Sequence, residues 1–314
     1  MNAIPRAYQR ELILLAAIGI VCVIFASRSE FFISERNLVT VLRNSVDLAV
    51  ISAGMTLVIA MGGIDVSVGG ILAVSAIIIG RAYQAEWPDA VVVVLGLATG
   101  CVLGALNGTV CAKLRVPPII ATLGSMYIFI AVLFLVIGGT WISGLPGTLS
   151  FLILGEWLGL PAGVYIIGVV YLLCWAILRR HVWGRHLLAV GSDEPAARLV
   201  GIDVDWIKIR TYTLLGLLAG IAAVLYVARL RNVEVNIGTN IALEAIAATI
   251  LGGADIRGGV GSLAGTLLGV LFIKLMQNGL VLSGVSSLWE TVIIGGLLLA
   301  VLTLDALQGR RVRV

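Results

Sequence analysis

A carboxylate and a hydroxyl lie between two glycine pairs in the middle of an otherwise apolar stretch of this chain. Asp65 and Ser67 belong to the segment Met61–Gly70, within an apolar run from Leu48 to Gly80. A charge inside a bilayer costs about 2.5 kcal/mol or more even on mild insertion scales, so it needs a reason. Backbone that leaves a helix at membrane depth must be buried in protein or face a wet cavity. Two roles fit: these residues line a translocation path, or they cap the helix that begins after the break.

A second group of polar residues lies nearer the end of the chain. Glu244 belongs to one apolar segment, and Lys274, Gln277 and Asn278 share the next. Glu244 and Lys274 form a buried ion pair in one interpretation, and Lys274 extends to the membrane surface in the other. The amides of Gln277 and Asn278 can hydrogen-bond hydroxyl groups. The candidates for a translocation path are therefore Asp65, Ser67, Glu244, Lys274, Gln277 and Asn278.

The sequence contains no set of residues that would perform catalysis. It lacks the Gly-x-x-x-x-Gly-Lys-Ser/Thr phosphate loop, the His-Glu-x-x-His zinc motif and the Gly-x-Ser-x-Gly nucleophile motif. The only histidines are His181 and His186, and no nucleophile, base and orienting group occur together. We therefore expect no catalytic, cofactor-binding or metal-binding residues and no enzymatic activity. Any ATP hydrolysis must take place in a separate subunit.

Composition and hydropathy predict an all-α polytopic membrane protein. Of the 314 residues 60% are hydrophobic and 12% are charged, whereas a soluble domain has about 25% charged residues. The apolar stretches are continuous and do not alternate with period two, which excludes a β-barrel. Each is long enough for a bilayer of about 30 Å. We predict about ten spans in one transmembrane domain, 1–314, near residues 11–27, 46–62, 66–84, 90–112, 118–138, 163–178, 211–228, 241–253, 260–282 and 288–306.

Two of these spans are interrupted by glycine-rich breaks. The segments 62–66 and 252–256 share the pattern Gly-Gly-x-Asp-aliphatic. Transporters often consist of duplicated halves whose broken helices mark the binding site. The pattern is either such a repeat or a coincidence of common residues.

The distribution of basic residues predicts the orientation in the membrane. Lys and Arg concentrate at both ends of the chain, at 113–115, throughout 179–210 and at Arg257, whereas Arg28, Arg36, Arg43, Arg81, Arg229 and Arg231 fall on the other side. Basic residues accumulate on the cytoplasmic side. Both termini are therefore expected in the cytoplasm. The net charge of +4 reflects this asymmetry and does not indicate a nucleic-acid partner.

A short helix outside the membrane is predicted within 183–202. Ser192 or Asp193 suits the N-cap, Glu194 and Pro195 suit the first turn, and Gly201 suits the C-terminal stop. The helix would contain about eight residues. Its positions 196, 197, 199 and 200 carry alanine, leucine and valine, which a solvated connector does not require. Small and aliphatic side chains fit a groove, so we expect this helix to dock on a partner protein.

Four motifs occur in an order typical of one protein family. They are Met61–Gly69, Ile119–Gly124, Gly184–Ile202 and Glu244–Gly253. Through them nearly the whole chain resembles the ribose-type permease family of bacterial ABC importers. That family includes permeases for xylose, arabinose, galactose, rhamnose and autoinducer-2.

The resemblance implies the rest of the assembly. The chain would be a multi-pass subunit of the bacterial inner membrane, paired with an identical or a sister permease. An ABC ATPase subunit and a periplasmic or lipid-anchored sugar-binding protein would complete an importer of a monosaccharide or similar small polyhydroxy ligand. Ser192–Gly201 would be the coupling helix on the ATPase, with the coupling residues Gly191, Asp193, Glu194, Ala196, Ala197, Arg198 and Gly201.

One alternative comes from the intramembrane carboxylates. A secondary transporter driven by an ion gradient would use Asp65 and Glu244 as a proton or cation relay. Such a protein has no use for a helix that docks on an ATPase. The predicted cytoplasmic helix therefore favours the importer.

Overall fold

The computed structural model describes residues 6–234 and 236–285, together with the single positions 289, 292, 293, 295, 296 and 299. Within this part of the chain, nine of the ten predicted spans form helices with similar bounds. These helices are α1 (Arg6–Ala26), α2 (Glu35–Ala60), α3 (Val68–Gln84), α4 (Asp89–Lys113), α5 (Pro118–Ile137), α7 (Ala162–Arg180), α10 (Val204–Leu230), α11 (Ile241–Leu251) and α12 (Leu263–Leu282). The predicted last span, 288–306, falls largely outside the described residues, as does the basic tail.

The lengths and composition of these helices confirm a polytopic helical membrane protein. Six of them, α2, α4, α5, α7, α10 and α12, are long and apolar enough to cross a membrane. Two shorter apolar helices, α3 and α11, adjoin the predicted breaks. Helix α2 begins at Glu35, well before the start of the span predicted at 46–62.

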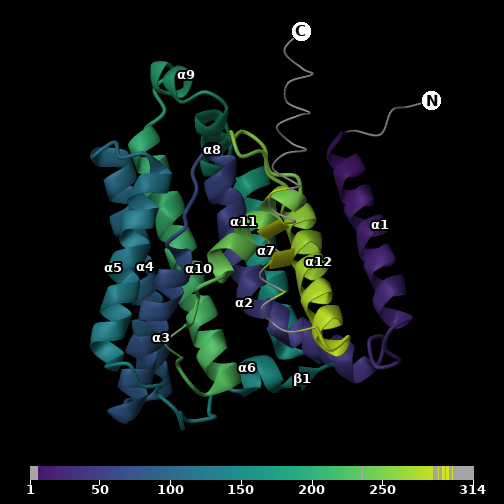
Figure 1. The fold of residues 1–314 in the computed structure, drawn as a ribbon. Coiled ribbons are helices and arrows are strands. Elements are labelled where there is room, and N and C mark those ends of the chain that lie inside the picture. Colours follow the sequence, from purple (N-terminus) through teal and green to yellow (C-terminus); the bar gives the residue numbers. More distant parts are fainter. Residues whose placement is uncertain are drawn as a thin grey trace, which may run out of the picture.

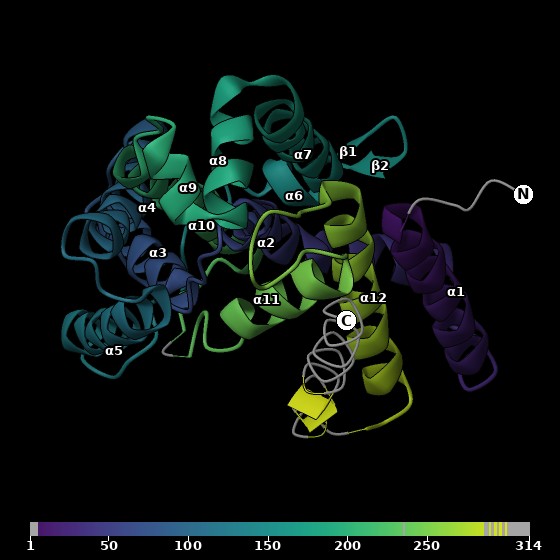
Figure 2. The ribbon, with the colours of Figure 1, turned by 90° about the horizontal axis from the view of Figure 1, so that it is seen from above.

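Helix α2 lies at the centre of the bundle, between α1 at one edge and α5 at the other (Figures 1 and 2). It contacts α7, α10, α11 and α12. Every residue from Ser45 to Ala60 is buried, as expected for a helix that is apolar all round and surrounded by protein. The outer helices instead expose leucine, valine and phenylalanine side chains such as Val23 and Leu135.

Helices α4 and α10 touch backbone to backbone. Gly100 and Gly104 of α4 face Gly216 and Gly220 of α10, and a Cβ added at any of the first three would overlap backbone atoms of the facing helix. Small residues four apart allow such close approach in membrane bundles. The spacing in the sequence predicts this contact.

The bundle has two distinct ends. Helices α8 (Val182–Ser192) and α9 (Glu194–Leu199) form what we call the α9 end, where α1 also begins (Figure 1). Helix α6 (Phe151–Leu154) and the hairpin of β1 (Glu156–Trp157) and β2 (Leu160–Pro161) form the α6 end. In the hairpin Trp157 pairs with Leu160. Helix α8 was not predicted, although His181 caps it by accepting a hydrogen bond from the Trp183 amide at 3.1 Å.

Both interrupted helices end in the same backbone motif. At the end of α2, the amides of Gly62 and Gly63 donate to the Ile59 and Val58 carbonyls. At the end of α11, the amides of Gly253 and Ala254 donate to the Ile250 and Thr249 carbonyls. Gly62 (φ 84°) and Gly253 (φ 97°) adopt the left-handed conformation that this Schellman motif requires after the last helical turn.

Candidate translocation cavity and coupling helix

Asp65 and Ser67 form a buried cluster at the start of α3. Both residues are fully buried. Asp65 Oδ1 accepts hydrogen bonds from the Ser67 amide at 2.8 Å and from Ser67 Oγ at 2.6 Å. Asn107 of α4 donates to Ser67 Oγ at 2.6 Å. Ser67 is the N-cap residue of α3, but its side chain makes no capping hydrogen bond, and Asp65 instead accepts from the Ser67 amide just before the helix.

A polar cavity of about 900 Å³ lies elsewhere, toward the α6 end of the bundle. It is lined by the first half of α2, the last turns of α10, the loop residues 234 and 236–240, and the facing sides of α11 and α12. Glu244, Lys274, Gln277 and Asn278 line it, as the sequence predicts for a path. Asp65 and Ser67 are not among the described residues that line it. The six candidates therefore separate into a lining group and a helix cap.

Glu244 and Lys274 form the ion pair that the sequence leaves open. Lys274 Nζ lies 2.9 Å from Glu244 Oε2. Gln277 Nε2 donates to Glu244 Oε1 at 3.0 Å, so both carboxylate oxygens have a partner. One residue further on, Asn278 and Asn37 of α2 exchange two amide hydrogen bonds of 2.8 and 2.9 Å. The amides and charges predicted on α12 thus connect it to α11 and α2.

The analysis of the sequence missed a second ion pair in the cavity wall. Arg229 Nη2 of α10 lies 2.5 Å from Asp47 Oδ2 of α2, and Arg229 Nη1 donates to Asn44 Oδ1 at 2.7 Å. All three residues line the cavity. Asp47 was visible as a carboxylate just inside a predicted apolar span, which is the same signal that drew attention to Asp65. Arg229 was assigned to an external turn because it ends a span.

The short helix beside the membrane ends close to the predicted positions. Asp193 Oδ1 accepts from the Ala196 amide at 2.9 Å, so Asp193 is the N-cap. The Ser192 hydroxyl instead donates back to the Leu188 carbonyl. Gly201 has a positive φ of 83°, as expected for a stop. The helix itself is six residues long, shorter than the eight predicted.

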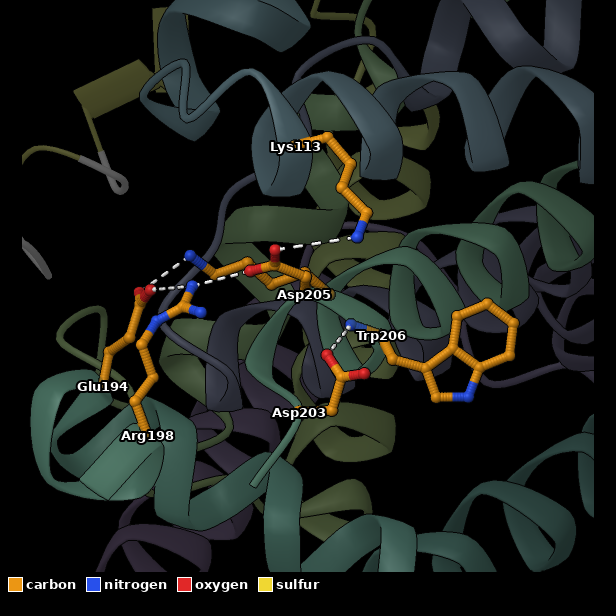
Figure 3. A network of polar contacts seen from close by, with 7 residues as sticks. Lys113, Glu194, Arg198, Asp203, Asp205 and Trp206 are labelled. Carbon is orange, nitrogen blue, oxygen red and sulfur yellow. Dashed lines mark hydrogen bonds and ion pairs between the residues drawn. The ribbon is translucent and has the colours of Figure 1, made fainter. Parts of the chain in front are cut away.

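Charged side chains tie α9 to two membrane helices (Figure 3). Arg198 lies 3.0 Å from Glu194 and 2.7 Å from Asp205 of α10. Lys208, also on α10, lies 2.7 Å from Glu194. Lys113, at the end of α4, lies 3.9 Å from Asp205. We refer to these five residues as the α9 charge network.

The α9 charge network also sets the charge state of Glu194. Partial burial raises the pKa of this carboxyl, but hydrogen bonds from Lys208 and Arg198 outweigh it and hold the pKa below the ordinary value of 4.5. A depressed carboxyl pKa means that the charged form is favoured in the folded state. Glu194 is therefore charged at neutral pH.

The side chains of α9 divide into an inner and an outer face. Ala197 is 3% exposed and packs against the rest of the chain. Leu199 and Val200 are 88% and 77% exposed. Of the predicted coupling residues, Ala197 therefore packs inward and holds α9 against the rest of the chain. Leu199 and Val200, which were not among the predicted coupling residues, form the outer face.

Gly191, in the last turn of α8, packs against the end of α2 and the loop that follows α11. The Gly259 amide, from the loop after α11, donates to the Ala60 carbonyl at the end of α2 at 2.8 Å. A Cβ added at Gly191 would overlap that Ala60 oxygen and would lie 2.6 Å from the Gly259 nitrogen. Gly258 Cα also faces the Gly191 backbone. The last turn of α8 therefore lies against the end of α2 and the loop between α11 and α12, with no room for a side chain at Gly191.

Known proteins match almost the whole chain. A family model described as the permease component of a branched-chain amino acid transport system matches residues 37–302. The ribose import permease protein RbsC of Escherichia coli (strain K12) is 36% identical over 96% of this chain and 95% of its own length.

Two further relatives carry other names. The fructose import permease protein FrcC of Rhizobium meliloti is 34% identical over 87% of this chain and 79% of its own length. The autoinducer 2 import system permease protein LsrC of Enterobacter sp. (strain 638) is 34% identical over 95% and 87%. No solved structure matches the chain. This chain therefore belongs to the permease family of bacterial ABC importers, as a multi-pass transmembrane component that is distinct from the ATPase.

Proposed function

We propose that this permease carries a monosaccharide or a similar small polyhydroxy ligand across the bacterial inner membrane. The observation that carries the proposal is the cavity of about 900 Å³, in which carboxylate, ammonium, guanidinium and amide groups line the inside of an apolar bundle. Such groups offer many hydrogen bonds to hydroxyls. The names of relatives at 34–36% identity, which refer to ribose, fructose and autoinducer 2, support the same ligand class.

The whole chain, 1–314, acts in this proposal as one permease domain. It pairs with an identical or a sister permease and works with an ABC ATPase subunit and a sugar-binding protein. The α9 end faces the cytoplasm together with both termini, because the basic segments 113–115 and 179–210 and Arg257 gather there. The cavity then opens toward the periplasm, where the binding protein delivers the ligand.

Conformational changes that ATP causes in the ATPase subunit are transmitted to the cavity through α9. Leu199 and Val200 dock on the ATPase, and movement of α9 passes through the α9 charge network into α10 and α4. Gly191 passes the same movement to the end of α2 and to the loop between α11 and α12. Because residues of α2, α10, α11 and α12 line the cavity, a shift of these helices alternates its access between the two sides. Asp65 and Ser67 hold the break before α3 and do not contact the ligand.

Uptake into energy-depleted vesicles tests this proposal against the secondary transporter. Vesicles that contain the permease with its ATPase and binding protein are given labelled D-ribose or D-fructose. Uptake is expected to stop when ATP is depleted and to continue when an uncoupler dissipates the ion gradients. The reverse pattern would establish an ion-driven transporter, and a lack of uptake of both sugars would contradict the ligand class.

A further inference from the structure

Among the described residues that line the cavity, Asp47 and Arg229 each have a buried side-chain atom without a hydrogen-bond partner. Asp47 lies on α2 and Arg229 on α10, and both line the cavity. We propose that these two residues form a subsite that binds two neighbouring hydroxyl groups of the transported ligand. This inference rests on the proposed function and names residues of the same path that the sequence did not indicate.

The bonding of the two cavity ion pairs differs. Glu244 uses both carboxylate oxygens, on Lys274 and Gln277. Asp47 uses only Oδ2, on Arg229, and its Oδ1 has no hydrogen-bond partner among the described residues. Arg229 uses Nη1 and Nη2, and in the same part of the chain its Nε is also without a partner. One acceptor and one donor are therefore left over, side by side in a single ion pair.

Stability does not account for a buried pair in this state. Asp47 is 6% exposed, and the Arg229 side chain is 14% exposed. Removing two charges from water is unfavourable, and apolar residues of similar volume would join two helices at least as well. An unsatisfied charged group adds to that cost. What sets this pair apart is that it lines the polar cavity, so its unused hydrogen-bonding capacity suits a role in binding or transport.

The leftover groups match the chemistry of a vicinal diol. One hydroxyl donates to Asp47 Oδ1, and its neighbour accepts from Arg229 Nε. The ion pair carries no net charge, so it suits a neutral ligand. The Tyr226 ring, whose centre lies 5.9 Å from the guanidinium carbon, also lines the cavity and offers an apolar face beside the pair.

The pair also connects ligand binding to helix movement. Asp47 Oδ1 and Arg229 Nε are covered in the conformation described. A ligand reaches them only when the end of α10 shifts relative to α2. Hydroxyl groups then satisfy atoms that are unsatisfied in the closed arrangement, so binding favours the open one.

The experiment measures D-ribose uptake and ATP hydrolysis by the assembled importer in proteoliposomes. The variants are Asp47→Asn and Arg229→Lys, which keep size and polarity but change the hydrogen-bonding groups. The matched controls are Glu156→Gln and Arg43→Lys, because that pair also joins α2 to the α6 end at 3.0 Å but is more exposed. We expect about tenfold lower uptake for the two cavity variants, the effect of losing a hydrogen bond to a charged group. ATP hydrolysis stimulated by the binding protein should change by less than about twofold, and the controls should resemble wild type.

A reversed pair separates ligand binding from a merely structural role. The double variant Asp47→Arg with Arg229→Asp keeps an ion pair between α2 and α10 but exchanges donor and acceptor. We expect it to remain deficient in uptake. Full rescue by the reversed pair, or normal uptake by both single variants, would overturn the subsite and leave the proposed function standing. Loss of ATP hydrolysis in step with uptake in a normally assembled complex would also overturn it. If wild type took up neither D-ribose nor D-fructose, the ligand class itself would be contradicted, and with it the subsite.

Discussion

The carboxylate of Asp65 is engaged by the polypeptide that surrounds it. One of its oxygens accepts from both the amide and the hydroxyl of Ser67, and Asn107 donates to that hydroxyl in turn. Thr122 of α5 accepts a hydrogen bond from the Val66 amide at 3.2 Å in the same break. These contacts satisfy polar backbone at membrane depth, where water is absent. Asp65 Oδ1 therefore supports the fold at this break, whereas Asp65 Oδ2 has no hydrogen-bond partner among the described residues.

Substitution of Asp65 should reveal this structural role. Asp65→Ala leaves the Ser67 amide and hydroxyl without their acceptor, and we expect a loss of about 1.5–3 kcal/mol in unfolding free energy. Asp65→Asn keeps an acceptor oxygen and should lose less. Denaturation of the purified permease in detergent measures both.

Asp255 provides the control for this substitution. It makes the same type of contact, accepting from the Arg257 amide at 2.9 Å, but its side chain is 36% exposed. Asp255→Ala should cost under about 1 kcal/mol, because water replaces the lost partner. Equal losses for the two alanine variants would contradict the role given to burial.

The same reasoning explains which site residues the sequence could reveal. Asp65, Glu244 and Lys274 stand out because each is a charge within an apolar stretch. Asp47 and Arg229 stand near predicted span ends, where charges are common and carry little information. Their pairing joins positions 182 residues apart, and no local pattern encodes which span ends meet in space.

Among the elements, apolar length predicted the helices well and glycine patterns predicted their ends less well. A span must cross about 30 Å of hydrocarbon, which fixes its length closely. The Gly-Gly-x-Asp pattern aligns Gly62 with Gly252, whereas the Schellman motifs align Gly62 with Gly253. Backbone hydrogen bonds, not the glycine pair, decide where the helix stops. Helix α8 was missed because its mixture of polar, glycine and apolar residues gives no long apolar run.

Gly191 packs against Ala60 at the end of α2 and Gly259 in the loop after α11, and this contact can be tested by substitution. Gly191→Ala inserts a methyl group between the Ala60 carbonyl and Gly259, and overpacking of this kind costs about 1–3 kcal/mol. We expect the rate of transport to fall more than the rate of ATP hydrolysis, because the substitution displaces the contact through which α9 is connected to the membrane helices. Uptake and hydrolysis by the reconstituted importer measure the two rates.

A glycine in open space serves as the control. An added Cβ at Gly168 of α7 meets nothing within 4 Å, so Gly168→Ala should leave both rates unchanged. If Gly191→Ala also leaves the ratio of uptake to hydrolysis at the wild-type value, Gly191 does not transmit movement from α9 to the membrane helices.

The outer face of α9 makes a second prediction for the coupling helix. Leu199→Glu with Val200→Glu places two charges on the side chains proposed to enter the ATPase groove, and each buried unpaired charge is strongly unfavourable. We expect the ATPase to be lost from the purified complex while the permease itself remains folded. Leu158→Glu, at a residue 97% exposed at the opposite end, should retain the ATPase. If all variants retain the ATPase, α9 is not part of the interface between the permease and the ATPase.

At the scale of the whole molecule, the proposed orientation is directly testable. Single cysteines at Leu158→Cys and Leu199→Cys are introduced after replacement of Cys22, Cys101, Cys111 and Cys174. Both positions are highly exposed, at 97% and 88%. In spheroplasts that lack the ATPase subunit, a membrane-impermeant maleimide should label position 158 directly and position 199 only after permeabilisation. The opposite result would invert the topology derived from the basic residues.

The shape of the cavity could not be predicted from the sequence, because it depends on how separate helices pack together. Its wall is built from the first half of α2, the end of α10 and parts of α11 and α12. Each helix is separately predictable, but their mutual rotation depends on tertiary packing between faces of similar hydrophobicity. The family motifs supplied the class of protein, and the structure supplied which residues face one another.

The glycine contact between α4 and α10 decides what can move during transport. With no side chains between the two backbones at Gly100 and Gly216, neither helix can rotate or slip along the other without steric collision. In the proposed mechanism, a movement that the ATPase imposes on α10 therefore displaces α4 by the same amount. The two helices then move as one rigid body, and the packing that changes is that between this pair and helices α2 and α3.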